Sequence, residues 1–353
     1  MDYKSTLKKL IEEVITQGGS DLHLSEGRLP TIRINGDLVP LHSYEVLTKE
    51  LNEGLLYEMI NKDFQEQFAK NQELDFSYEY ENGDRFRGNA FVQQGRVGVV
   101  MRLIPNKIKS LQELGLPPFL ETFTRKKQGF FLVVGPVGQG KSTTLAAMID
   151  MINEERAEHI ITIENPIEYV YKQKKSIIDQ REVRIDTETF NSALLGTFRQ
   201  DVDVILVGEM RGSDTIASAV TAAETGHLVF STLHTNNASQ TIDRIIDSFP
   251  GNQQDQIRVQ LAGSLIGIFS QRLIPRISGG MVPAYELLVN NNAVQNLIRE
   301  SRTHEISTVI ETGSESGMID MNRTLADLVR RGEITAENAL LHSFRPQMLE
   351  KMI

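Results

Sequence analysis

A glycine-rich stretch near the middle of the chain has the residue types and the spacing that bind phosphate groups. Gly135, Gly140, Lys141 and Ser142 fill the pattern G-x-x-x-x-G-K-S in the sequence GFFLVVGPVGQGKSTTLAAMI. An apolar run precedes the pattern and a helix-forming run follows it, which is the context that a phosphate-binding loop requires. A chance glycine-rich turn is the alternative, but it would not combine this spacing with the Lys-Ser pair. The pattern therefore predicts that the chain binds ATP or GTP.

Each residue type in this loop suits the binding of a nucleotide. Glycines let backbone N–H groups surround the phosphates, and the N-terminus of the following helix favours negative charge. We expect the Lys141 ammonium to reach the β and γ phosphates and the Ser142 hydroxyl to bind Mg²⁺. The residues expected to contact the nucleotide are consecutive: Gly135, Pro136, Val137, Gly138, Gln139, Gly140, Lys141, Ser142 and Thr143.

Carboxylates follow two further apolar runs. Glu209 ends the run DVDVILVGE, and Glu164 ends the run HIITIE, with Glu168 four residues later. Because α/β sheets open onto their ligand at the carboxyl ends of the strands, these side chains are expected beside the nucleotide. Glu209 would complete the Mg²⁺ site with Ser142 or polarise the attacking water. The other two glutamates would supply a general base and a metal ligand. A solvated strand end and ordinary surface charge are the alternatives.

Two histidines, His227 and His234, close the apolar run LVFSTL at its two ends. A histidine beside a buried strand is usually a structural residue whose hydrogen bonds its neighbours satisfy. The pair by itself leaves a functional and a structural interpretation open.

The composition limits the classes of protein to which the chain can belong. With 353 residues it is too long for one ordinary core, so we expect two or three domains. The formal net charge of -10 argues against a protein that coats nucleic acid, and the lack of cysteine excludes disulfides and thiolate zinc sites. No apolar run approaches the ~20 residues that span a bilayer. We expect a cytoplasmic protein with no nucleic-acid partner, which reaches a membrane only through other proteins.

The pattern of apolar residues predicts the domain organisation. Leu7, Leu10, Ile11 and Val14 fall at helical spacing and predict a first helix that ends near Gly18. The pairs Asn35-Gly36 and Asn82-Gly83 stand between alternating runs and predict two tight hairpins. Proline residues at 105, 117 and 118 then interrupt the pattern, and strands alternate with helices from about Gly129. From about Gly251 to the end, including QQDQIRVQLAGSLIGIFSQRLI, we expect mostly helix. The predicted division is an N-terminal domain over 1–105, a linker over 106–125, a P-loop domain over 126–275 and a helical region over 276–353.

Four motifs follow one another along the chain: GPVGQGKSTT, ITIENPIEYV, DVILVGEMRGSDTI and TAAETGHLVFSTLHT. Their order closely resembles the secretion-type ATPase superfamily, and within it the PilT/PilU branch, the retraction motors of type IV pili. The opening GGSDLHLSEG resembles the PAS-like domain of that family, GNAFVQQGRVGVVMRLIP its interdomain region, and VQNLIRE its helical motif tied to retraction. The resemblance implies an α/β RecA-like P-loop ATPase domain with a helical C-terminal extension, preceded by an α+β PAS-like N-terminal domain.

The resemblance assigns roles that the patterns leave open. It implies that Glu164 is the catalytic glutamate and that Glu209 is the Walker B glutamate. It also implies that His227 and His234 form a His box near the nucleotide, where hydrogen bonds would register the loss of the γ-phosphate. Arginines of the N-terminal domain are expected at the γ-phosphate, where a guanidinium stabilises the charge of the transition state. Arg87 and Arg102 match these arginines.

Several residues depart from the pattern of the family. Asn165 and Gly212 each stand where the family usually has Asp, and Gln295 stands where it has Arg. The chain also has Gly95-Arg96 where the family commonly has Arg-Gly. These departures lead to the hypothesis of a divergent or accessory retraction ATPase.

The resemblance also implies the partners. They are a homohexameric ring, ATP and Mg²⁺, the inner-membrane platform protein of the pilus, and a paralogous retraction ATPase, all at the cytoplasmic face of the inner membrane. Three alternatives stay open. The first is an assembly or secretion ATPase, whose relatives usually carry an extra N-terminal domain and a four-cysteine zinc element. The others are a nucleic-acid translocase and a nucleotide-binding switch without turnover.

Overall fold

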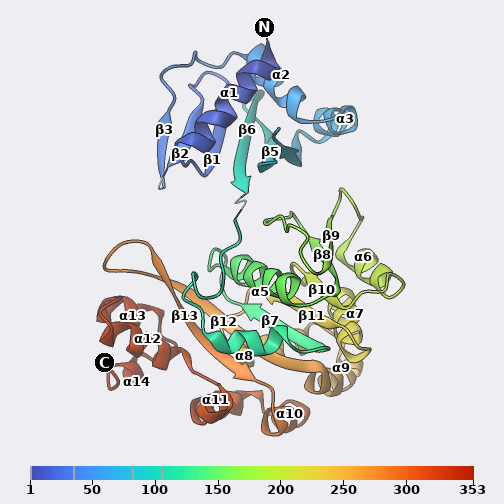
Figure 1. Cartoon of the computed structure of the whole chain (residues 1–353), viewed down its shortest axis with the longest axis vertical. Coiled ribbons are helices and arrows are strands. Elements are labelled where there is room, and N and C mark those ends of the chain that lie inside the picture. The colour runs from blue at the N-terminus through green and yellow to red at the C-terminus, as the bar shows by residue number, and fades with distance from the viewer. Residues whose placement is uncertain (1, 35, 82, 105–106) are drawn as a thin grey trace. The chain divides into compact units, whose positions relative to one another are not determined.

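Residues 1–107 form one unit of the chain and residues 108–353 form a second. Each unit is built around a sheet of its own, which agrees with the predicted α+β domain followed by an α/β domain. The structure, a computed structural model, describes residues 2–34, 36–81, 83–104 and 107–353 (Figure 1).

Among the described residues, the first unit forms a six-stranded antiparallel sheet. Across the sheet the strands are β3 (Asp37–Pro40), β2 (Thr31–Ile34), β1 (Asp21–Ser25), β6 (Arg96–Ile104), β5 (Arg85–Gln93) and β4 (Glu73–Glu79). The helices of this unit are α1 (Tyr3–Thr16), α2 (Lys49–Met59) and α3 (Lys62–Asn71). Alternate residues of the strands share one core with these helices, and the intervening residues include the exposed Arg87 and Arg102.

The predicted first helix and the antiparallel pairing of the strands that the two hairpins would join are confirmed. The four apolar residues at helical spacing are buried on α1: Leu7, Leu10, Ile11 and Val14. The strands on either side of the two predicted hairpins pair antiparallel, β2 with β3 and β4 with β5. Asn35 and Asn82, on which the hairpin predictions depend, lie outside the described residues.

In the described part of the second unit, seven strands form one sheet. Their order is β13 (Met281–Val289), β12 (Leu265–Pro275), β7 (Gly129–Val134), β11 (Leu228–Leu233), β10 (Val204–Val207), β8 (His159–Glu164) and β9 (Ile177–Glu182). All neighbouring strands are parallel except β12 and β13. β7, β10 and β11 are buried along their whole lengths, which explains why the sequence shows continuous apolar runs there rather than alternation.

Helices cover both faces of this sheet. Phe130, Leu132 and Val134 of β7 pack into one core with α6, α7, α8 and α9, while Phe131 and Val133 pack into a second core with α5. The helices are α5 (Lys141–Glu155), α6 (Phe190–Thr197), α7 (Ser213–Glu224), α8 (Ala238–Asp247) and α9 (Gly251–Ser264). Because these strands are parallel, the carboxyl ends of β7, β8, β10 and β11 lie together at one end of the sheet.

The prediction of helix from Gly251 onward is wrong in its middle part. α9 ends at Ser264, and the next residues form β12 and then β13. The apolar residues of this run continue the helical spacing of α9, and a short buried run does not distinguish helix from strand. Pairing with β7 decides the outcome, because it buries Ile268 and Phe269 completely.

The region expected to be helical over 276–353 therefore begins with an edge strand, and its helices follow. They are α10 (Asn292–Arg299), α11 (Ile306–Thr312), α12 (Met321–Arg330), α13 (Ala336–His342) and α14 (Pro346–Leu349). Across the ranges that the structure describes, no helix combines the length and the apolar character needed to cross a membrane.

The segment expected to be a linker, 106–125, belongs to the second unit from Ile108 onward. Its apolar residues are buried in the same core as α5: Leu111, Leu116, Leu120 and Phe123, the last on the short helix α4 (Glu121–Thr124). The Phe123 ring packs against Phe131 of β7 with 4.4 Å between ring centroids. The predicted interruption at Pro105 lies outside the described residues.

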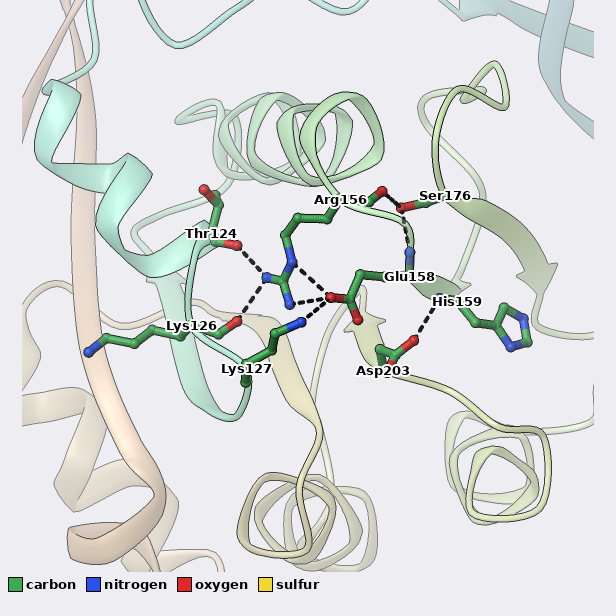
Figure 2. A network of polar contacts seen from close by, with 8 residues as sticks. All are labelled: Thr124, Lys126, Lys127, Arg156, Glu158, His159, Ser176 and Asp203. Carbon is green, nitrogen blue, oxygen red and sulfur yellow. Dashed lines mark hydrogen bonds and ion pairs between the residues drawn. The ribbon is translucent and has the colours of Figure 1, made fainter.

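A polar network fixes the end of this segment to the start of β8 (Figure 2). The buried Glu158 carboxylate accepts hydrogen bonds from Arg156 at 2.9 Å and from Lys127 at 2.7 Å. Arg156 also donates to the carbonyl oxygens of Thr124 at 2.5 Å and Lys126 at 2.8 Å. Burial alone would raise the pKa of Glu158, but the hydrogen bonds and charges of the two cations outweigh it and lower the pKa. Glu158 is therefore ionised, and it ties these segments together at the amino-terminal end of the parallel strands, whereas the phosphate loop lies at their carboxyl end.

Candidate functional site

The predicted phosphate-binding loop joins β7 to α5. Gly135, Gly138 and Gly140 have φ angles of 147°, 77° and 78°, which side chains rarely tolerate. A Cβ atom at Gly135 would lie 2.4 Å from the backbone oxygen of Gln271, so only glycine fits there. Val137 is exposed in the loop. Lys141, Ser142 and Thr143 form the start of the long helix α5, and the positive end of the helix dipole faces the loop.

Lys141 is the first residue of α5, and its ammonium folds back over the loop. Its Nζ atom donates to the carbonyl oxygens of Gly135 and Pro136, both at 2.8 Å, and lies 3.3 Å from Nδ1 of His234. Burial lowers the pKa of Lys141, and nearby carboxylates oppose this shift. The cation is thus held by carbonyl oxygens that phosphate oxygens can replace.

Glu164 ends β8, as predicted, and is buried. Its Oε1 atom accepts hydrogen bonds from the Thr162 hydroxyl at 2.7 Å and from the Gln180 amide at 3.4 Å. Burial raises the pKa of Glu164 to about 7, although both donors oppose the shift. A carboxyl group with this pKa exchanges a proton near neutral pH, as a general base must.

Glu209 follows β10 and lies between an arginine and a histidine. One carboxylate oxygen is 2.8 Å from Nη2 of Arg211, and the other is 3.9 Å from Nε2 of His234. Through His234, Glu209 is connected to Lys141. The sequence motif contains Arg211, but no spacing rule predicted that it would pair with Glu209.

Tyr169 is a second residue that sequence reasoning missed. Its hydroxyl lies 2.8 Å from Oγ1 of Thr143, in the first turn of α5. This contact ties the segment that follows Glu164 to the phosphate loop. A tyrosine in the run IEYVY carries no sequence signal of such a contact, because only the fold brings the two segments together.

His227 does not lie with these residues in the fold of one chain, so its place in a His box near the nucleotide stays a prediction. The six-residue strand β11 separates it from His234, so the two stand about 20 Å apart. The His227 ring packs edge-on against Phe198, with 5.6 Å between centroids, and its Nδ1 lies 3.0 Å from the Ala222 carbonyl oxygen. These contacts match the structural interpretation of this histidine.

Arg87 and Arg102 stand directly opposite each other on β5 and β6 of the first unit. Nε of Arg102 donates to Asp21 at 2.8 Å. Arg96, at the departing position, has Nε 3.6 Å from a carboxylate oxygen of Glu26. Because these residues belong to the first unit and the loop to the second, their role at the γ-phosphate stays a prediction.

Ser142 and Glu209 offer hard oxygen ligands of the kind that Mg²⁺ prefers. Within the described residues, no three or more His, Cys, Asp or Glu side chains are grouped so that they could hold a metal ion by themselves. In nucleotide sites Mg²⁺ takes one or two protein oxygens and completes its shell with phosphate oxygens and water. A hydroxyl and a carboxylate at a phosphate loop fit that donor set.

Comparisons with known proteins agree with this geometry. The family model described as Type II/IV secretion system protein matches residues 3–313. The type IV pilus retraction ATPase PilT of Pseudomonas aeruginosa is 45% identical over 323 residues, which cover 92% of this chain and 94% of that protein. The type IV pilus ATPase PilU of the same organism is 39% identical over 347 residues, 98% of this chain and 91% of that protein.

Among solved structures, the crystal structure of the pilus retraction motor PilT with bound ADP is similar to this one. It has 46% sequence identity and a TM-score of 0.92, and the match covers 98% of each chain. Both units and the phosphate loop thus have counterparts in a nucleotide-binding ATPase. The chain belongs to the family of type II/IV secretion system proteins.

Proposed function

We propose that this chain is a motor ATPase that hydrolyses ATP to drive the retraction of type IV pili, and hence twitching motility. One observation carries the proposal: Lys141, Glu209 and His234 converge at the phosphate loop, beside the strand that ends at the buried Glu164. The match to PilT over 94% of that protein's length supports retraction as the process that the hydrolysis drives.

In the proposed reaction, water attacks the γ-phosphorus and the bond to the β-phosphate oxygen breaks. The loop amides and Lys141 neutralise the phosphate charge, and Glu164 orients the water and takes up its proton. A pKa of about 7 leaves part of the Glu164 population ionised at neutral pH. The departure at Asn165 changes an exposed position next to this base and leaves the buried carboxylate itself in place.

We assign the Ser142 hydroxyl and the Glu209 carboxylate as the protein ligands of Mg²⁺. When bound with the nucleotide, the ion supplies positive charge that stabilises the phosphate oxygens. Arg211 pairs with one oxygen of the Glu209 carboxylate at 2.8 Å, and the His234 ring lies 3.9 Å from the other oxygen.

The proposed working form is a homohexameric ring at the cytoplasmic face of the inner membrane, acting on the platform protein of the pilus. A paralogous retraction ATPase is a further proposed partner. Arg87 and Arg102 are proposed to complete the nucleotide site in this ring. The exposure of both arginine side chains, only one of which donates to Asp21, supports this role.

Steady-state hydrolysis of ATP by the purified protein with Mg²⁺ tests the enzymatic part. We expect Lys141→Ala and Glu164→Gln to abolish turnover, since each removes a group that acts on the phosphate or the water. Lys126→Ala and Glu154→Gln are matched controls, because both side chains are exposed and far from the loop in the fold. A wild-type protein that binds ATP without turnover would identify a nucleotide-dependent switch instead.

The process is tested in a strain that lacks its main retraction motor. Full recovery of twitching by this chain alone would support a main motor. No recovery in this strain, together with stronger twitching when the chain is added to a strain that keeps its main motor, would support the accessory role to which the departures at Asn165 and Gln295 point. Recovery of pilus assembly without retraction would identify an assembly ATPase.

A further inference from the structure

Gln271 of β12 packs directly against the phosphate loop. Its side chain is 3% exposed, and both ends of its amide are bonded. Nε2 donates to the carbonyl oxygen of Gln139 at 2.8 Å, and Oε1 accepts from the Thr144 hydroxyl at 2.6 Å. A carbonyl oxygen only accepts and must therefore face the NH₂ group, so these two partners define the orientation of the amide.

The two partners of Gln271 are Gln139, which precedes Gly140 in the sequence, and Thr144, which follows it by four residues. A Cβ atom on Gly140 would lie 2.9 Å from Nε2 of Gln271, so the amide lies directly against this glycine. The side chain of Gln139 makes the reciprocal contact, because its Oε1 accepts from the backbone N–H of Leu273 at 2.7 Å. Three hydrogen bonds therefore join β12 to Gln139 of the loop and to Thr144 in the first turn of α5.

This contact determines where a phosphate-binding amide points. In a trans peptide the C=O and N–H bonds point in opposite directions. Holding the Gln139 carbonyl toward β12 therefore aims the N–H of Gly140 away from β12. In loops of this pattern the backbone N–H groups around the Gly-Lys pair bind the phosphates.

We infer that Gln271 is a positioning residue for nucleotide binding, which orients the peptide between Gln139 and Gly140 so that its N–H faces the phosphate. It does not touch the nucleotide. Because the amide it orients binds phosphate in ADP and ATP alike, the expected effect is on affinity rather than on the chemical step. A residue on the strand that sequence patterns predict as helix thus sets the geometry of the loop.

Gln271→Glu tests this inference, because it keeps the size and the acceptor for Thr144 but removes the donor to Gln139. We expect the dissociation constant for ADP, measured by calorimetry on the full-length protein, to rise about tenfold, the equivalent of one strong hydrogen bond. KM for ATP should rise in proportion, with kcat changed less than about threefold.

The matched control is Gln254→Glu on α9. Gln254 also donates to a backbone carbonyl oxygen, that of Phe249 at 3.1 Å, but away from the loop. We expect it to keep the ADP affinity of the wild type within twofold. Circular dichroism and thermal melting establish that each variant is folded.

A folded Gln271→Glu protein that binds ADP within twofold of the wild type would overturn the inference, even with a lowered melting temperature, since Gln271 would then only stabilise the fold. If the buried carboxylate prevents folding, Gln271→Met replaces it, because the side chain is of similar length and uncharged. The same tenfold loss is expected for Gln271→Met, and unchanged ADP affinity would equally overturn the inference.

Discussion

The Nζ atom of Lys141 lies 3.3 Å from the Nδ1 atom of His234. Because an ammonium group only donates, this ring nitrogen must be the unprotonated acceptor, and the proton of the neutral ring is then on Nε2, on the side of Glu209. Partial burial and the positive charge of Lys141 lower the pKa of His234, which keeps the ring neutral at pH 7. His234 is thus the link between the phosphate loop and the Glu209 carboxylate.

The two histidines should differ in their effect on catalysis. We expect His234→Ala to lower kcat for ATP hydrolysis by about 10- to 100-fold, because a hydrogen bond to a charged group is worth about 1.5–3 kcal/mol. His227→Ala should keep kcat within about threefold, because His227 lies at the other edge of the sheet. Equal losses in the two variants would contradict this separation and restore a joint His box in the assembled protein.

Hydrolysis should depend on the ionisation of Glu164. Since burial raises the pKa of this carboxyl to about 7, the basic form increases between about pH 6 and pH 8. We expect kcat/KM to rise through this window and then level off, and Glu164→Gln to remove both the activity and the dependence. Affinity for ADP, measured at each pH, separates binding from ionisation. A wild-type profile that is flat from pH 5.5 to 9 would exclude Glu164 as the base.

The same carboxyl should lower the stability of the fold at high pH. A pKa raised from 4.5 to about 7 means that the folded protein binds more protons than the unfolded chain between these values, so stability falls as the pH rises through them. Glu164→Gln keeps an acceptor for Thr162 and Gln180 and removes the buried charge. We expect it to be more stable than the wild type by up to about 3 kcal/mol at pH 8 and by almost nothing below pH 4.5.

Chemical denaturation at several pH values measures this difference. The exposed Glu154→Gln is the control for the loss of one carboxylate at the surface. A Glu164→Gln variant that is less stable than the wild type at pH 8 would mean that the site tolerates the ionised carboxylate well.

Arg156 should matter for stability but not for nucleotide binding. Its removal leaves the buried Glu158 with Lys127 alone and frees the carbonyl oxygens of Thr124 and Lys126. We expect Arg156→Ala to lower the free energy of unfolding by about 2–4 kcal/mol, as breaking a buried ion pair does. ADP affinity of the folded variant should stay at the wild-type value, since the network lies at the opposite edge of the sheet.

Arg125→Ala is the control for this network. The Arg125 side chain is 61% exposed and pairs with Glu121 on the surface, so its loss should cost no more than about 0.5 kcal/mol. Equal losses for the two arginines would show that the buried network contributes nothing beyond surface charge.

The sequence by itself determined the parts of this protein that depend on local pattern. The phosphate loop is recognisable because its glycines, lysine and serine are neighbours in the chain. Glu164 and Glu209 could be placed because each ends an apolar run, and parallel strands bring their carboxyl ends to one edge. The first helix follows from apolar residues at helical spacing, and the paired strands around the two hairpins follow from alternating runs.

The tertiary structure decided what depends on contacts between distant segments. The run after Ser264 became a strand because β7 pairs with it. The two histidines were separated because they stand at opposite ends of the six-residue strand β11. Gln271 and Tyr169 act through partners that lie far from them in the chain, and Arg156 joins its neighbour Glu158 to the distant carbonyl oxygens of Thr124 and Lys126. No spacing rule encodes such pairs, since a hydrogen bond depends on atoms within about 3 Å of each other, and only the packed fold brings those atoms together.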